Sequence, residues 1–336
     1  MSSADISDHN TRAVLAALRE NGALTRRALA GALGLTETAI ASIVRRMVES
    51  HFLKQHSPAG GGQGATFSII EDAGIGIGVY LYKKKARIAV VSLAGAVVDE
   101  REFGSCGDVL EWIDDIVEAP SPRRIPDIAV ASDPASADLL VALLQQRDGQ
   151  KCKMFQVRDT EAALSSLRLT PGVNTDIGMG VILIDETVRA GTMFSDRFFY
   201  GARGCAGQIG AMRPAPDAPT LNETAGLLSF NAHIAAGRPE DEWVEHAASR
   251  LLDAIVAISA FVSPGEFWIG GSLPEPVLDT IVERVVAGKA LKAGHFIATR
   301  WIPAVNRLED TGTAIARGAA MVTLKQAFLP LPASDG

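Results

Sequence analysis

The segment from residue 36 to 50 holds the side chains best placed to do chemistry. One face of a helix over this segment would gather apolar residues at three- and four-residue spacing, namely Ile40, Ile43, Val44, Met47 and Val48. The opposite face would carry Thr38, Ser42, Arg45 and Glu49, with Arg46 beside them. Short polar side chains and arginines on one face suit the major groove of DNA. The pattern therefore predicts a DNA-reading helix, with an ordinary surface helix pair as the alternative.

A second short helix must hold this helix in place. Residues 25–33 are amphipathic, and a tight turn at Gly34-Leu35-Thr36 joins them to the segment above. Thr25 and Thr36 precede the two helices, where a hydroxyl can accept a free N–H of the first turn. Two helices joined by so short a turn indicate a helix-turn-helix motif.

The flanking sequence completes a larger pattern. Residues 10–21 are expected to form a preceding helix, and residues 52–56 and 66–70 two strands. The intervening SPAGGGQGA is predicted to be a glycine-rich hairpin tip, with a flexible linker as the alternative. Three helices followed by a β-hairpin is the order of a winged helix. The DNA-binding residues expected in this domain are Thr25, Arg26, Thr36, Thr38, Ser42, Arg45, Arg46 and Gln63.

Composition and charge narrow the class of protein. The 336 residues are 47% apolar and 21% charged, with a net charge of −7, a balance typical of a globular chain of two or three domains. Residues 1–56 hold seven Lys/Arg against five Asp/Glu, whereas the remainder holds 25 against 34. A mildly basic head on an acidic body fits a small DNA-binding module attached to a domain that does not bind DNA.

The chain lacks the marks of a membrane or metal protein. No apolar run reaches the ~18 residues that a membrane span requires, and the N-terminus has no signal pattern. We therefore expect a cytoplasmic protein without membrane contact. Three scattered cysteines, Cys106, Cys152 and Cys205, argue against a disulfide framework. Neither they nor the six histidines show metal-ligand spacing, so no metal and no cofactor are expected.

From residue 75 onward the pattern changes to alternating strands and helices, which predicts an α/β body of two strand-led lobes. The order of elements recurs after residue 172, although no residue pattern repeats. The expected strands cover 75–82, 86–93, 96–103, 125–132, 152–157, 177–184, 187–194, 267–269 and 296–302. The expected helices cover 109–118 and 135–146, begin at 159, 276 and 313, and fill 223–262.

These blocks and their spacing resemble the ROK family, which groups bacterial sugar-responsive repressors with sugar kinases of the actin-like ATPase fold. The resemblance runs from about residue 10 to 328 and is carried by GALTRRALAGALGLTETAIASIVRRMVESHFL, IGVYLYKKKARIAVVSLAG, IGMGVILIDETVRAGT, GARGCAGQIGAM and FWIGGSL. It implies a winged helix-turn-helix domain at 1–72, followed by a two-lobed actin-like ATPase (ROK sugar kinase-like) domain at 73–336. The lobes are expected at about 73–171 with 310–330, and at 172–309. A winged head on this body is typical of the family's regulators, because its kinases lack the head.

The phosphate-binding loops of the family's kinases are not kept. Where those kinases have an Asp-x-Gly-x-Thr loop, this chain has Tyr80-Leu81-Tyr82-Lys83-Lys84, and bulky tyrosines exclude a tight phosphate turn. The lysines at 83–85 could attract an anion, but a solvated hairpin tip is the favoured alternative. The second loop, Gly-Thr-Gly in the kinases, reads Asn174-Thr175-Asp176, whose aspartate repels phosphate. We therefore expect no ATP turnover and no enzyme activity.

The sugar pocket that the family implies is partly kept. Arg158-Asp159 stands where the family has an Asn-Asp pair, so the carboxylate that serves the kinases as general base remains. Gln208 and Ala211 replace a Glu and a His, and Glu223 can supply a further acid; a helix N-cap is the alternative role for both Asp159 and Glu223. The family's zinc-binding Cys loop is absent before Glu223, so zinc is not expected. The expected effector-binding residues are Arg158, Asp159, Gln208, Ala211 and Glu223.

Together these features predict a DNA-binding transcriptional regulator whose body senses a sugar or sugar derivative. Repression of sugar uptake or catabolism genes is the habit of the family. The alternatives are a sugar kinase with an added DNA-binding head, and a regulator that has lost ligand binding. A lone winged helix reads only a few base pairs, so double-stranded DNA with a palindromic operator is the expected partner. The matching assembly is a homodimer held by the body, with a tetramer as the alternative.

Overall fold

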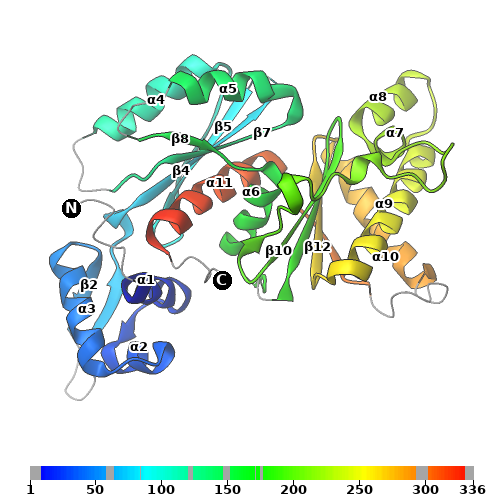
Figure 1. Ribbon diagram of the computed structural model, residues 1–336. Coiled ribbons are helices and arrows are strands. Elements are labelled where there is room, and N and C mark those ends of the chain that lie inside the picture. The colour runs from blue at the N-terminus through cyan, green and yellow to red at the C-terminus, as the bar shows by residue number, and fades with distance from the viewer. Residues whose placement is uncertain are drawn as a thin grey trace. The chain divides into compact units, whose positions relative to one another are not determined.

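The chain forms two compact units (Figure 1). The computed structural model describes residues 9–57, 64–83, 85–119, 124–146, 152–170, 172–174, 177–292 and 302–329. The first unit comprises Met1–Ala131, Asp138–Val157 and Ala319–Gly336, and the second comprises Ser132–Ala137 and Arg158–Gly318. The domain boundaries predicted near residues 72 and 172 stay predictions.

The first unit begins with a winged helix-turn-helix domain. Its elements are α1 (His9–Asn21), β1 (Leu24–Thr25), α2 (Arg26–Leu33), α3 (Glu37–Glu49), β2 (Leu53–His56) and β3 (Thr66–Ile69). The strands pair in the order β1-β3-β2, and β2 runs antiparallel to β3 with His56 opposite Thr66. The predicted order of three helices and a hairpin is confirmed, and the two-residue strand β1 is an addition to it.

The turn between α2 and α3 sets the angle of the motif. Thr25 and Thr36 cap the two helices as predicted, since their hydroxyls accept the backbone N–H groups of Ala28 and Ala39 at 3.2 Å. Gly34 ends α2 in the left-handed conformation, with φ 65°, where a residue with a Cβ is strained. The two helices are bent by 115°, within the range of about 90–120° that is typical of helix-turn-helix motifs.

The three helices and the hairpin share one apolar core. Its buried residues include Val14, Leu15, Leu18, Leu29, Ile40, Ile43, Val44, Met47, Phe52, Leu53 and Phe67. The predicted inward face of α3 is confirmed for all its members except Val48, which lies at the margin and is partly exposed. Burying one such side chain stabilises the fold by roughly 1.5–3 kcal/mol, so the core fixes which face of α3 remains outside.

The remainder of the first unit is built on a five-stranded sheet of order β6-β5-β4-β7-β8. Its elements are β4 (Ile75–Tyr82), β5 (Lys85–Ser92), β6 (Val97–Phe103), α4 (Cys106–Glu118), β7 (Ile128–Ser132), α5 (Ala137–Gln146) and β8 (Met154–Gln156). Helices α4 and α5 cover one face, and α11 (Thr311–Phe328) lies along the other (Figure 1). That close approach needs Gly76, because a Cβ there would meet the Ala320 carbonyl oxygen at 2.3 Å.

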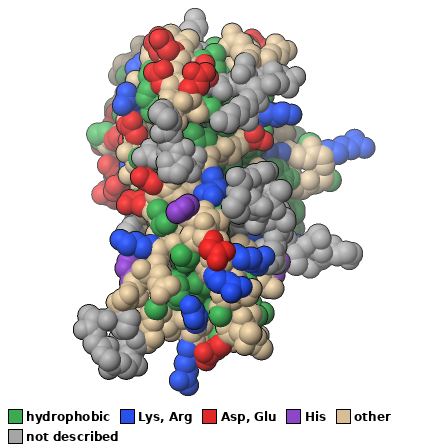
Figure 2. All heavy atoms as spheres, turned by 90° about the vertical axis from the view of Figure 1, so that its left-hand side faces the viewer, with side chains coloured by type: hydrophobic (Ala, Val, Ile, Leu, Met, Phe, Trp, Pro, Cys, Tyr) green, Lys and Arg blue, Asp and Glu red, His purple; other side chains and the backbone are tan. Residues whose placement is uncertain are grey.

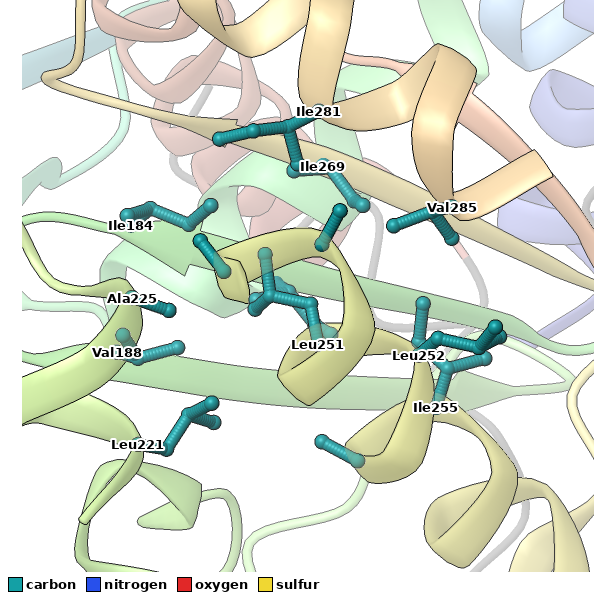
Figure 3. Packing of buried hydrophobic residues seen from close by; sticks show 14 of the residues in the cluster. Ile184, Val188, Leu221, Ala225, Leu251, Leu252, Ile255, Ile269, Ile281 and Val285 are labelled. Atoms are coloured by element: carbon teal, nitrogen blue, oxygen red, sulfur yellow. The ribbon is translucent and has the colours of Figure 1, made fainter. Parts of the chain in front are cut away.

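The second unit is built on a sheet of order β11-β10-β9-β12-β13. Its strands are β9 (Met179–Ile184), β10 (Val188–Phe194), β11 (Arg197–Phe198), β12 (Glu266–Gly271) and β13 (Ala304–Arg307). Its helices are α6 (Asp159–Ser166), α7 (Leu221–Ala225), α8 (Leu227–Ala235), α9 (Glu240–Val262) and α10 (Glu275–Lys292). Side chains of α7, α9 and α10 meet those of the sheet in a large apolar cluster, where Leu251 and Ile269 are fully buried (Figure 3).

The two sheets repeat one topology, as predicted. Each begins with three antiparallel strands, β4 to β6 and β9 to β11, and ends with parallel strands. The strand predicted at 296–302 is wrong at Ile302, which lies outside any strand. Residues 296–301 lie outside the described residues. The strand β13 begins at Ala304, after Pro303, because proline has no N–H for the ladder. Pro126 likewise accounts for the start of β7 at Ile128 rather than at 125.

No single helix in the described ranges is long and apolar enough to cross a membrane; α2 and α3 pass that test only when taken together across their bend.

Candidate functional site

The outward face of α3 is open to solvent. Thr38, Ser42, Arg45, Arg46 and Glu49 are all exposed, opposite the buried face of the same helix. On the side of the molecule drawn in Figure 2, Lys and Arg side chains recur over the lower part, which the N-terminal domain forms, and Asp and Glu gather toward the top. Exposed hydroxyl and guanidinium groups on one helix face can donate to phosphates and to base edges.

The other predicted DNA-binding residues that the structure describes make contacts within the winged domain. The hydroxyls of Thr25 and Thr36 accept the cap hydrogen bonds described above. Arg26, exposed at the start of α2, places its guanidinium 5.4 Å from the ring centre of Phe67 in β3, which links α2 to the wing. Gln63 lies outside the described residues, so its place at the wing tip stays a prediction.

The carboxylate of Asp159, the expected ligand of a sugar, is already paired. Asp159 is the buried first residue of α6. Its Oδ2 accepts the Nε of Arg189 at 3.1 Å and the Nη2 at 2.6 Å, and its Oδ1 accepts the backbone N–H of Thr160 at 2.7 Å. The same Nη2 donates to Asp185 Oδ2 at 2.6 Å, and Ser272 Oγ donates to Asp185 Oδ1 at 2.5 Å. Two carboxylates therefore share one guanidinium.

All three guanidinium nitrogens of Arg189 donate hydrogen bonds within the second unit. Its Nη1 donates to the carbonyl oxygen of Thr187 at 3.1 Å and to its hydroxyl at 2.8 Å, so all three nitrogens have acceptors. The side chains of Arg189, Asp159 and Asp185 are only 18%, 9% and 7% exposed. In this arrangement three hydrogen bonds use most of the roughly four acceptor positions of the Asp159 carboxylate.

The electrostatics of this cluster follow from its burial. Burial raises the pKa of Asp159, and the attraction of Arg189 acts in the opposite direction. Burial alone would lower the pKa of Arg189, but the two carboxylates outweigh it and raise that pKa above its ordinary value. The arginine therefore stays charged, and it is what makes two buried carboxylates tolerable in one place.

Sequence reasoning did not find Arg189, Asp185 or Ser272. A weak signal existed, because Arg189 lies between Val188 and Ala190 in a strand expected to be buried, and buried arginines are almost always paired. That signal predicts a partner but does not identify it. The partner Asp159 is 30 positions away along the chain, and only the packing of α6 on β10 brings the two together.

Arg158 holds the loop that follows β11. Its Nη1 donates to the carbonyl oxygen of Ala206 at 3.3 Å, and its Nη2 donates to that of Gly204. The guanidinium lies 5.2 Å from the ring centre of Tyr200 and 5.9 Å from that of Phe198. Arg158 thus acts as a brace within the second unit, and its donors to the loop are in use.

Glu223 belongs to a capping box at the start of α7. The Thr220 hydroxyl accepts the N–H of Glu223 at 3.3 Å, and Glu223 Oε2 accepts the N–H of Thr220 at 2.7 Å, a hydrogen bond that lowers the pKa of Glu223. The alternative role as a helix cap therefore describes Glu223. It does not describe Asp159, because the cap position of α6 is Arg158 and no side chain caps it.

Gln208 and Ala211 are exposed on the segment that joins this loop to α7. Gln208 precedes a single 3₁₀ turn, Ile209–Ala211, and Ala211 is its last residue. Leu221 N donates to the carbonyl oxygen of Met212 at 2.8 Å. The residues that were expected to bind the sugar thus differ in their contacts. Asp159, Arg158 and Glu223 hold hydrogen bonds within the protein, whereas the side chain of Gln208 is exposed to solvent.

A hollow of about 400 Å³ in the second unit has a different lining. Its walls are mainly apolar and come from the segment before α7, from α7 and from α9; they include Met212, Leu221, Ala254, Val256, Ala257 and Ala260. None of the five predicted effector residues lines it. Within the described part of the chain, no three His, Cys, Asp or Glu side chains are grouped to hold a metal ion.

The segment that was expected to replace a phosphate loop is a tight hairpin closed by a glutamate. Tyr82 pairs with Lys85 across it. Glu102 of β6 accepts the Tyr82 hydroxyl at 2.7 Å, Lys85 Nζ at 2.8 Å and Arg87 Nε at 3.0 Å, and these hydrogen bonds lower the pKa of Glu102 to about 2. Two of the basic groups near the hairpin, Lys85 and Arg87, thus pair with one carboxylate. In the second loop, Asn174 is described, and 175–176 lie outside the described residues.

Comparisons with known proteins agree with the two parts of the fold. Residues 7–54 match a family model described as "Winged helix-turn-helix DNA-binding". An uncharacterized protein of Sinorhizobium fredii (strain NBRC 101917 / NGR234), y4fQ, is 22% identical over 369 aligned positions, which cover 97% of this chain and 93% of that protein.

Solved structures extend the likeness to the whole chain. A ROK family transcriptional regulator, described as a homologue of the E. coli MLC protein, is 15% identical with a TM-score of 0.73, over 96% of this chain and 98% of its own. The ROK hexokinase of Thermus thermophilus, also 15% identical, has a TM-score of 0.61 over 75% of this chain and 99% of its own. A ROK family glucokinase of Streptomyces griseus, solved with glucose and AMPPNP, has 15% identity and a TM-score of 0.55 over 74% and 99%.

The class of protein follows from these observations. The chain carries a winged helix-turn-helix DNA-binding domain on an α/β body with the actin-like fold of the ROK proteins. The ROK family transcriptional regulator shares this fold over nearly the whole chain, whereas the kinases share it over about three quarters of the chain. The predicted resemblance and fold class are confirmed.

Proposed function

We propose that this protein is a DNA-binding transcriptional regulator that uses α3 as its recognition helix. The observation that carries the proposal is the exposed face of α3, where Arg45 and Arg46 stand with hydroxyl side chains on a helix whose other face is buried. Arginine and short polar side chains are the groups that contact phosphates and base edges in the major groove. Thr25 and Arg26 at the start of α2, Thr36 at the start of α3 and Gln63 of the wing complete the proposed DNA surface.

The proposed role is that of a repressor of sugar uptake or catabolism genes, acting as a homodimer on a palindromic operator. Support for sugar comes from the fold alone, which this body shares with a hexokinase and with a glucokinase solved with glucose. The proposed effector is a sugar or sugar derivative held near Asp159, Gln208 and Glu223. A partner of this kind would have to displace Arg189 from Asp159 or bind beside the pair.

The proposed body does not transfer phosphate. Two observations support this proposal. The carboxylate that would act as base is paired with Arg189, and in the hairpin at the place of the phosphate loop Lys85 and Arg87 are paired with Glu102. A general base must reach the proton that it removes, and the Oδ2 of Asp159 is already held by Arg189. A sugar kinase with an added DNA-binding head is therefore the weaker candidate.

The internal pairing favours a second candidate within the class of regulators, in which the body has lost ligand binding. Asp159, Arg158 and Glu223 all hold hydrogen bonds to other parts of the second unit. A body of this kind would keep the fold for assembly and answer to a protein partner. The two candidates share the DNA surface and differ only in whether a sugar stabilises the protein.

Selection of duplexes from random-sequence DNA by the full-length protein tests the proposed function. Enrichment of one inverted-repeat sequence, bound with a strong salt dependence, is the expected result. Recovery of no preferred sequence would overturn the proposal. A thermal-unfolding screen against neutral sugars, sugar phosphates and sugar acids then separates the two candidates, because a ligand at 100 times its Kd stabilises by about 2.7 kcal/mol. An ATP-hydrolysis assay with the same sugars tests the kinase alternative.

A further inference from the structure

Arg124 is bound on both sides of the junction between the winged domain and the first-unit sheet. It lies between α4 and β7, and its backbone pairs with the start of β4: Ile75 N donates to the Arg124 carbonyl oxygen at 3.0 Å. Arg124 N donates to the Ala73 carbonyl oxygen at 3.3 Å, and Gly74 forms a parallel bridge with Arg124. The backbone of Arg124 is thereby fixed to the edge of the body.

The side chain of Arg124 reaches the end of the recognition helix. Its Nη2 donates to the carbonyl oxygen of Ser50 at 2.8 Å, and Ser50 is the residue that ends α3. Its Nη1 donates to the Ala73 carbonyl oxygen at 3.3 Å. The guanidinium also lies 4.0 Å from the ring centre of the buried Phe52. A cation at a helix C-terminus is favoured by the helix dipole, so the contact holds the end of α3 in one direction.

A second set of contacts holds the other side of the winged domain. Arg12 of α1 donates through Nη1 to the carbonyl oxygens of Gln326 and Leu329 at 3.2 and 3.1 Å, at the end of α11. The ring of Phe52 meets that of Phe328 edge-on, with centres 6.2 Å apart. Arg19 of α1 also donates through Nη2 to Met321 Sδ of α11 at 2.8 Å. Among the described residues, the winged domain thus contacts the remainder of the first unit both at Arg124 and along α11.

We propose that Arg124 is a positioning residue that sets the direction of α3 relative to the first-unit sheet, and so the spacing at which two recognition helices of a dimer meet DNA. This inference rests on the proposed function. Specific two-fold readers require their half-sites to lie a whole number of helical turns, about 10 bp each, apart. A head free to swivel would tolerate other spacings, and a head held by Arg124 does not.

Arginine suits this place better than lysine would. The planar fork donates to two carbonyl oxygens that belong to different elements, Ser50 and Ala73, while its flat face covers the Phe52 ring. The ammonium of lysine is a point charge and cannot make these three contacts at once. Substitution of lysine therefore keeps the charge and removes the geometry.

Spacing tolerance is the measurement that tests the proposal. The inverted repeat selected by the wild-type protein is compared with versions whose half-sites are moved apart by about half a turn, roughly 5 bp, and with a single half-site. Wild type, R124A and R124K are measured on each duplex. Arg101→Ala is the matched control, because Arg101 also makes an ion pair and lies over a ring in the first unit, with Asp99 and Trp112.

In R124A and R124K we expect affinity for the selected repeat to fall about tenfold, as for the loss of a hydrogen bond from a charged donor. Affinity for the single half-site should stay within about twofold of wild type, because the face of α3 is untouched, and the penalty for the wrong spacing should shrink. Arg101→Ala should leave all three unchanged. Thermal unfolding of each variant shows whether the chain is folded.

Two outcomes would overturn the proposal. One is unchanged spacing preference in both Arg124 variants. The other is an equal loss on the repeat and on the half-site, which would make Arg124 a support of α3 itself. If the wild type recovers no preferred duplex, it is the proposed function that fails. If the wild type binds all spacings equally, DNA binding stands and the positioning role falls.

Discussion

The recognition face of α3 and the carboxylate site of the body differ in where their polar side chains find partners. On α3, Thr38, Ser42 and Arg45 are exposed along a helix whose caps and core are complete without them. In the body, Asp159 is buried and held by Arg189, which also holds Asp185. One site offers its polar groups to solvent, and the other has joined its groups to each other.

This difference bears on what each site can bind. An exposed side chain exchanges water for a ligand at small cost, whereas a buried ion pair must be broken before either member can accept a new partner. The proposed DNA surface needs no such rearrangement. A ligand of Asp159 would have to displace Arg189 or bind beside the ion pair, and several substitutions test this difference between the two sites.

The largest expected effect follows removal of the guanidinium in the body. R189M leaves Asp159 and Asp185 buried without their cation, so the free energy of unfolding should fall by about 3–5 kcal/mol at neutral pH. The gap to wild type should narrow as the pH falls toward 4. The reason is that the pKa of Asp159, already raised by burial, loses the opposing attraction, and protonation then relieves the repulsion.

Urea unfolding of R189M and wild type at several pH values measures this effect. Arg284→Met, at an exposed ion pair of the same unit, is the control and should change stability by less than about 1 kcal/mol. A stability of R189M equal to that of wild type at pH 7 would mean that the carboxylates do not depend on this arginine, and the contrast between the two sites would disappear.

The next effect concerns the DNA surface. Replacement of both Arg45 and Arg46 by Ala should weaken DNA binding by roughly a hundredfold, since contacts of this kind contribute about 1–3 kcal/mol each. If both touch phosphates, the slope of log affinity against log salt should fall by about 1.8, or 0.9 for each contact. Electrophoretic shift or fluorescence anisotropy at several salt concentrations measures both quantities.

The control for this pair is a double substitution of the exposed Arg238 and Arg284, which removes the same charge from the second unit. It should leave affinity and slope nearly unchanged. If the α3 variant behaved like this control, α3 would not lie in the groove, and the open surface would have another use.

A smaller effect is expected at the hairpin of the first unit. Glu102→Gln removes the acceptor shared by Tyr82, Lys85 and Arg87. Glu102 has a pKa of about 2 in the folded protein, so its contribution is present above its unfolded pKa of about 4.3 and is lost as the pH falls toward 2. Because the side chain is 38% exposed, the loss should stay below about 1 kcal/mol at pH 7.

Thermal unfolding of Glu102→Gln and wild type between pH 2 and 7 measures how the difference in stability depends on pH. The difference in stability between them should be largest at neutral pH and vanish at low pH. R189M removes a cation and Glu102→Gln removes an anion, yet in both cases the difference from wild type shrinks as the pH falls. A difference that grows with acidity would contradict the pairing of Glu102 with the basic side chains.

The last prediction is that removal of the winged domain leaves the oligomeric state unchanged. Deletion of residues 1–70 should leave a homodimer at micromolar concentration, because the winged domain offers no coiled-coil repeat of its own and the body is the expected site of assembly. Sedimentation of the truncated and full-length proteins compares them. A monomeric body beside a dimeric full-length chain would place the contact in the head.

Much of the N-terminal domain could be predicted because its signals are local. The caps Thr25 and Thr36, the turn at Gly34 and the apolar spacing of α3 all act within a few residues, and each is seen in the structure. Most strands of the body were also predictable from apolar runs, although Pro303 and Pro126 move two boundaries, β8 and β9 begin two residues later than expected, and β11 was not expected. The candidate DNA face follows directly from the helix, because exposure on α3 is set by periodicity.

The two-part architecture and the outward face of α3 could be read from the sequence, because each depends on residues near one another in the chain. The states of Asp159 and Arg124 depend on the tertiary structure, since Asp159 is paired with Arg189 and Arg124 holds the end of α3. Glu223 differs from them, because its capping-box partner Thr220 is only three residues away. A charged side chain takes the partner that folding brings within hydrogen-bond distance. Residue type limits that choice and does not make it.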